Sequence, residues 1–170
     1  MIGRTGMADF YENERNYVHT NGSDVTCTVA AAGAVTDGGT NITFASLAST
    51  TTAGTVFTIP GVYQCHPETK AAMANLQQFT IVTGSTTTQE VSPAFFLTGG
   101  RQNVVNAAGA QLAATFFNST ALVPVFVGAA STTYAQGLMY HKDAFTFATA
   151  ELPKIGGAHS CVTKTFDGLS

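Results

Sequence analysis

Hydrophobic and polar positions alternate along this chain in short runs separated by turn residues. Val25, Cys27 and Val29 alternate with polar neighbours, and Ile42 and Phe44 repeat the pattern. A period of two predicts a half-buried β-strand. Gly, Pro, Asn and Asp gather between these runs, as they do in turns. About six such strands at a spacing of about 8–15 residues predict a small antiparallel barrel or sandwich.

The strongest alternation lies in residues 20–100, where we expect an all-β core. Further strands are predicted over residues 56–59, 62–65, 76–82 and 90–97. The pair Pro60-Gly61 is a turn signal that should close the first of them. One or two helical turns are expected over residues 67–74, because Pro67 suits the first helical position. Residues 107–117 are a candidate helix, and Pro124 should place residues 122–127 at a sheet edge.

Composition excludes several classes of partner. Charged residues make up only 10% of the 170 positions, against about 25% in an average globular domain. Seven Lys and Arg side chains spread along a chain of net charge −3 cannot neutralise a row of phosphates, so we expect no specific nucleic-acid binding. No run of 18 apolar residues is present, so no membrane-spanning helix is predicted.

The cysteines and histidines do not form a metal-binding pattern. Cys27, Cys65 and Cys161 are an odd number of widely spaced thiols without a secretion signal, which predicts three reduced side chains. Cys65 and His66 are adjacent and would point to opposite faces of a strand. His159 shares a face with Cys161 but supplies only two ligands with it, so we expect neither a metal nor a cofactor.

No catalytic constellation stands out. His141 and Asp143 flank Lys142 in a polar turn without a positioned partner. Glu12 and Glu14 lie in a polar lead-in that predicts a solvated surface. The nucleophile elbow and the phosphate-binding glycine loop are both missing from the sequence. We therefore expect that the chain is not an enzyme.

Two runs carry a resemblance to a known family. Residues 54–79 read GTVFTIPGVYQCHPETKAAMANLQQF, and residues 134–154 read YAQGLMYHKDAFTFATAELPK. Together with GMADFYEN at residues 6–13, the pair His19-Thr20 and the run at 102–104, they resemble the major capsid (coat) proteins of short-tailed bacteriophages. In that family a β-barrel is inserted into the tailed-phage capsid fold.

The resemblance implies a mainly-β chain with an inserted barrel and partial segments of a capsid body. The expected parts are a lead-in from the body over residues 1–19, the barrel over 20–100, a variable connection over 101–134 and a truncated return into the body over 135–170. Family members are usually more than twice this length, so the chain resembles a fragment.

The implied function is that of a structural subunit in an icosahedral capsid, assembled in the host cytoplasm and located in the virion. Other coat subunits would be its partners in a homo-oligomeric shell, and a scaffolding protein is a possible further partner. The barrel would support folding of the body and contact neighbouring subunits through a loop. The nearest candidate for that loop is residues 33–41, with Gly33, Val35, Asp37, Gly38 and Gly39 as contact residues.

A second class of function is a non-catalytic β-sandwich binding module for carbohydrate or surface adhesion. Such a module needs exposed aromatic side chains on a flat face. The chain has no Trp, and most of its 12 Phe residues fall at strand positions that a core would take.

From the resemblance we predict that this chain folds but forms no closed shell alone. Shell closure requires several different interfaces on each subunit, and the family's arm and helical body would supply most of them. Sedimentation velocity should show a monomer or a small, concentration-dependent oligomer. Closed particles from this chain alone in electron micrographs would refute the fragment interpretation.

Overall fold

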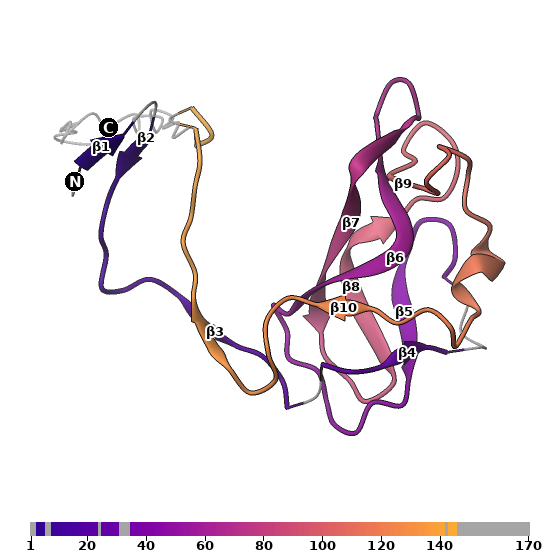
Figure 1. Ribbon diagram of the computed structural model, residues 1–170, viewed down its shortest axis with the longest axis horizontal. Helices are drawn as coiled ribbons and strands as arrows, with labels where there is room; N and C mark the ends of the chain where they lie inside the picture. The colour runs from indigo at the N-terminus through magenta and orange to yellow at the C-terminus, as the bar shows by residue number, and fades with distance from the viewer. Residues whose placement is uncertain (1–2, 6–7, 24, 31–34, 142, 146–170) are drawn as a thin grey trace, which may run out of the picture. The chain divides into compact units, whose positions relative to one another are not determined.

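The computed structural model describes residues 3–5, 8–23, 25–30, 35–141 and 143–145 (Figure 1). The chain divides into two compact units, Met1–Gln136 and Gly137–Ser170. Among the described residues, all helices and strands lie in the first unit. They are β1 (Gly3–Thr5), β2 (Ala8–Phe10), β3 (Val18–Thr20), β4 (Thr28–Val29), β5 (Gly39–Ala45), β6 (Val56–Cys65), β7 (Ala72–Thr83), β8 (Thr88–Phe95), β9 (Val104–Val105), the 3-10 helix η1 (Ala114–Phe117), β10 (Val125–Phe126) and β11 (Thr133–Ala135).

The main sheet is antiparallel and runs in the order β10-β6-β7-β8-β5-β4, with β9 also paired to β6. It curls as half of a barrel, and β10 crosses near β4 at its open side (Figure 1). The expectation of a mainly-β fold is confirmed. The half-barrel does not close into a continuous ladder, because β4 and β10 are both edge strands that pair only with β5 and β6.

The core fills the concave side of the half-barrel with aliphatic and aromatic side chains. Phe79 is fully buried, with its ring stacked at 4.5 Å from that of Phe95 and at 5.8 Å from that of Phe57. The ring centroid of Phe126 lies 5.6 Å from that of Phe57, and the ring centroid of Phe117 lies 5.4 Å from that of Phe95. The rings form a continuous column that joins β10, β6, β7, β8 and η1.

The prediction of a turn at Pro60-Gly61 is wrong. β6 continues through this pair as one long strand, and the register to β7 shifts between Thr58 and Tyr63. Gly61 has φ +83°, and a side chain there would press against the ring of Phe116. The glycine therefore makes a bulge that bends the strand, as bulges do in curled sheets.

The two helices expected from the sequence are not formed as predicted. Residues 67–69 form a tight turn, and β7 begins at Ala72. Of residues 107–117 only the four residues of η1 are helical. The edge position of residues 122–127 is confirmed, since β10 pairs only with β6.

The segment expected as a variable connection contributes to the barrel. β9 pairs with β6, and the side chains of Val104, Leu112 and Phe117 belong to the same buried cluster as the sheet residues. The boundaries of the four expected parts stay a prediction. The packing itself runs without interruption from Cys27 to Phe126.

A buried amide organises the loops at one end of the sheet. Gln89 is fully buried, and its Oε1 accepts hydrogen bonds from Thr51 Oγ1 and the Ser85 amide. Its Nε2 donates to the carbonyls of Ser85 and Thr87. Because both ends of the amide are paired, burying this polar group is tolerated.

The lead-in at the start of the chain contains three short strands. β1 and β2 form a hairpin with an ion pair between Arg4 and Asp9, 3.3 Å apart. β3 pairs with β11 in a two-stranded antiparallel ladder, in which His19 lies opposite Tyr134. We call this ladder the stem.

The described part of the second unit is short and local. The Tyr140 and Phe145 rings meet edge to face at 5.0 Å, and His141 lies 3.4 Å from the carboxylate of Asp143.

The aromatic column generates a stability prediction. Phe79→Ala should lower the free energy of unfolding by about 3–5 kcal/mol, because it leaves a cavity between two stacked rings. That loss is a large part of the about 5–15 kcal/mol that holds a domain folded. Urea unfolding followed by circular dichroism measures it.

Val82→Ala is the matched control on the same strand, because Val82 is about half exposed and its truncation should cost within about 1 kcal/mol. Equal losses of unfolding free energy in the two variants would contradict the conclusion that the column is the centre of the core.

Candidate functional site

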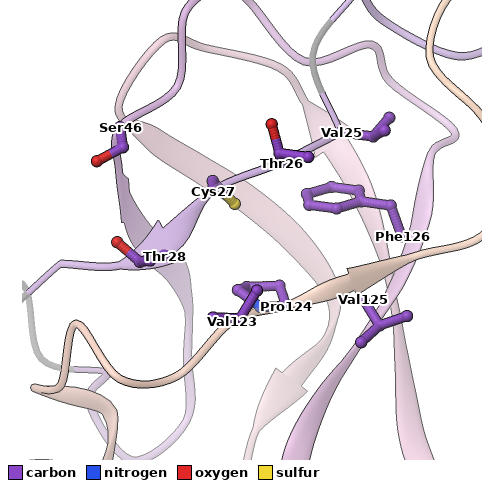
Figure 2. Close-up of a pocket in the computed structure, with 9 residues that line it drawn as sticks. All are labelled: Val25, Thr26, Cys27, Thr28, Ser46, Val123, Pro124, Val125 and Phe126. Atoms are coloured by element: carbon purple, nitrogen blue, oxygen red, sulfur yellow. The ribbon is translucent and has the colours of Figure 1, made fainter.

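One hollow of the half-barrel lies where its two edge strands approach each other. This groove has a volume of about 530 Å³ between the β4 segment and the β10 segment. Figure 2 shows the ring of Phe126 extending toward Val25 and Cys27, while Val125 points to the other side of its strand. The lining residues are Val25, Thr26, Cys27, Thr28, Ser46, Val123, Pro124, Val125 and Phe126.

The chemistry of this groove is apolar with a rim of hydroxyl groups. No acid, base or histidine is among the lining residues. The two segments that border the groove are joined by a hydrogen bond that the Val29 amide donates to the Leu122 carbonyl at 2.9 Å. Pro124 has no amide hydrogen to offer an added strand, a common protection of a sheet edge.

The loop expected to contact neighbouring subunits is held against the barrel. Gly33 lies outside the described residues. Val35 is fully buried in the core, and Gly39 already begins β5. Of the described residues before β5, Thr36, Asp37 and Gly38 form an exposed tip, with Gly38 in the left-handed region at φ +77°. The loop is therefore a short turn, and its role in contacts between subunits stays a prediction.

Asp37 fixes this turn to the end of β8. Its Oδ1 accepts hydrogen bonds from the amides of Leu97 at 2.7 Å and Thr98 at 3.3 Å, and its Oδ2 accepts one from Thr98 Oγ1 at 3.0 Å. The Leu97 amide and then the Thr98 hydroxyl hold the pKa of this carboxyl below its ordinary value of 3.8. The ionised form is favoured because these donors all point at it.

A second hollow, of about 250 Å³, lies where the stem meets the half-barrel. His19 of the stem is only 6% exposed, and its Nε2 lies 3.3 Å from Oγ1 of the buried Thr55. Gly54 has φ +91°, and a side chain there would meet the imidazole ring. The absence of a side chain at Gly54 lets the ring lie flat against the loop before β6.

Asn21 and Tyr134 complete the contact on the other side of the stem. The buried Asn21 donates through Nδ2 to the carbonyls of Val127 at 3.0 Å and Ala129 at 3.1 Å. The Ala129 amide donates to the hydroxyl of Tyr134 at 2.7 Å. A side chain at Gly128 would come within 2.6 Å of the Tyr134 ring. These groups position the stem, and none of them forms an acid–nucleophile pair.

The residues weighed as metal ligands have other roles where they are described. Cys65 is a buried free thiol. His66 uses Nδ1 to accept the amides of Glu68 and Thr69, so it caps the turn between β6 and β7. No group of three or more His, Cys, Asp and Glu side chains is placed to hold an ion within the residues described. His159 and Cys161 lie outside them, and the expectation of no metal stays a prediction.

Reasoning from individual residues missed the stem. Tyr17, His19 and Asn21 alternate with Val18 and Thr20, which is the pattern of a strand with one covered face. This alternation covers too few residues to distinguish a strand from the charged lead-in that precedes it. Its partner strand lies more than a hundred residues away, and no local rule connects the two.

Comparison with known proteins identifies no relative: the chain matches no family model, no curated protein and no solved structure. None of the helices in the described residues is long and apolar enough to cross a membrane.

The hydrogen bonds of Asp37 generate a prediction about pH. Asp37→Asn should destabilise the chain at neutral pH, because the neutral amide is a weaker acceptor and brings a donor toward the Thr98 hydroxyl. A carboxyl whose pKa is lowered by folding stabilises the fold above the ordinary value of 3.8, and this contribution is lost as the pH falls through the lowered pKa.

The difference in unfolding midpoint between the wild type and Asp37→Asn should therefore be constant above about pH 5 and shrink below about pH 4. Thr98→Val removes only the hydroxyl donor and should give a smaller loss with the same pH dependence. An equally large difference at pH 7 and pH 3 would contradict the assignment.

Proposed function

We propose that this chain is a structural subunit of a bacteriophage icosahedral capsid, in which the half-barrel is a domain inserted into the capsid body. The proposal starts from the resemblance of residues 54–79 and 134–154 to coat proteins of short-tailed phages. The first of these runs forms β6, its turn and most of β7, at the centre of the sheet.

The observation that supports an inserted domain best is the stem. The chain enters the half-barrel through β3 and leaves it through β11, and the two strands pair in register. The Gln136 amide donates to the Tyr17 carbonyl at 2.9 Å, so entry and exit are adjacent. A domain inserted into another must begin and end at one place on its host, and this geometry meets that requirement.

The stem also supports the proposed role in folding. His19 and Tyr134 are partners in the ladder although they are 115 positions apart (134 − 19). Closing a flexible loop of that length costs about 4 kcal/mol of chain entropy. A half-barrel that folds first would already hold the two flanking segments together. Folding of the capsid body would then not include the chain-entropy cost of bringing these segments together.

The surface composition suits a protein that is covered by neighbours. Charged side chains are depleted at the centres of protein–protein interfaces. Residues 20–135 contain only six: Asp24, Asp37, Glu68, Lys70, Glu90 and Arg101. By contrast, the most exposed aromatic side chains of the described residues lie at positions 10–17 and 140–145, and none of these positions belongs to a strand of the half-barrel sheet. That distribution gives little support to a carbohydrate-binding platform on the sheet.

A chimaera tests the proposal. Residues 17–136 would replace the inserted domain of a full-length coat protein from a short-tailed phage, joined at the stem. We expect closed particles in negative-stain micrographs, because the stem presents both ends at one place. The same coat protein with a flexible linker in place of its inserted domain is the control, and it should give fewer particles or none.

A soluble, folded chimaera that never forms particles would count against the capsid proposal. Saturable binding of the 170-residue chain on a glycan array would instead favour the alternative of a binding module.

A further inference from the structure

We propose that the side chains at the base of the stem form a clamp, which makes the stem and the half-barrel one rigid body. The clamp consists of His19, Asn21, Thr55 and Tyr134, with Gly54 and Gly128 leaving room for them. The bend between the half-barrel and whatever the chain joins then lies outside Tyr17 and Gln136. This inference concerns the chain itself and does not rest on the proposed function.

The stem needs such a clamp because it is too small to persist alone. It has three residue pairs, and its outer face carries only Val18, Thr20, Thr133 and Ala135. A single two-stranded ribbon is at best marginally stable in water. One hydrogen bond between the hydroxyls of Thr20 and Thr133, 2.9 Å apart on the exposed face, adds little to this.

The inner face supplies the missing stability through contacts that cross from stem to half-barrel. His19 reaches Thr55, and the backbone of Thr55 is itself tied to β7, because the Ile81 amide donates to its carbonyl at 2.9 Å. Asn21 reaches the carbonyl of Val127, whose amide donates to Val56 of β6 at 2.8 Å. Both contacts therefore end on backbone that the central strands hold in place.

Two independent contacts, one to the residue before β6 and one to the residue after β10, fix the angle between stem and half-barrel, whereas one contact would leave a hinge. Tyr134 adds a third through the Ala129 amide. The two glycines fit the same purpose: each has a positive φ, and each would clash with a clamp side chain if it carried a Cβ. Buried polar groups that are fully paired hold one arrangement in preference to others.

Residual dipolar couplings on the wild-type 170-residue chain test rigidity directly. We expect one alignment tensor to fit the amides of residues 18–21 and 131–135 together with those of β6, β7 and β8. A need for separate tensors for stem and half-barrel in the wild type would overturn the proposal.

Variants then test whether these side chains are the cause. Gly128→Ala should displace Tyr134 and Asn21. We expect at least about tenfold faster hydrogen exchange at the Asn21 and Ser131 amides, which bond across the stem to Thr132 and Gly22, while β6 and β7 stay protected. Gly137→Ala is the matched control, because no atom lies within 4 Å of the added methyl group.

Asn21→Ala is a milder second variant that removes two donors and adds no bulk. It should also speed amide hydrogen exchange in the stem. The residual dipolar couplings of this variant should require separate alignment tensors for the stem and the half-barrel. Unchanged stem protection in both variants would overturn the clamp. Loss of protection in β6 and β7 to the same extent as in the stem would overturn it too, because these residues would then belong to the barrel core.

Discussion

The column of phenylalanine rings determines the rest of this structure. Phe57, Phe79 and Phe95 come from three consecutive strands and stack across the concave face of the sheet. Such a column buries a large apolar area only if the sheet curls around it. Curling brings β4 and β10 toward each other without completing the ladder, which leaves the apolar groove between them. The bulge at Gly61 gives β6 the bend that this curling requires.

The column also explains which parts of the fold could be predicted from the sequence. Alternation along residues 25–29, 42–44 and 90–97 identified strands because each has one face in the core and one in water. The turn expected at Pro60-Gly61 was wrong, because two turn-forming residues can equally make a bulge when the core continues on both sides. Phe117 and Phe126 looked like a connection, since their ring partners are distant in sequence and no periodicity links them. Long-range packing decided these cases.

The same limit applies to the candidate sites. Cys65 is a buried thiol, and His66 caps the turn that follows it through amides only two and three residues further along the chain, so this contact is local. The stem, by contrast, depends on pairing between His19 and Tyr134. Each strand is three residues long and carries too little local signal. The two strands come close enough to pair only when the half-barrel is folded. The stem therefore depends on the core and could not be predicted from local sequence.

Asp37 shows how the few charges of this chain are used. Both of its carboxylate oxygens accept hydrogen bonds from the end of β8, so the charge fixes a turn of its own chain. Of the roughly four acceptor positions of a carboxylate, three are taken by Leu97 and Thr98, so little of this group is left for a cation on another molecule. Contacts by this turn with a neighbouring subunit would therefore rely on its fixed shape more than on a free charge. The rigid attachment inferred for the stem fits that requirement, because a contact made through shape needs a surface held at one angle.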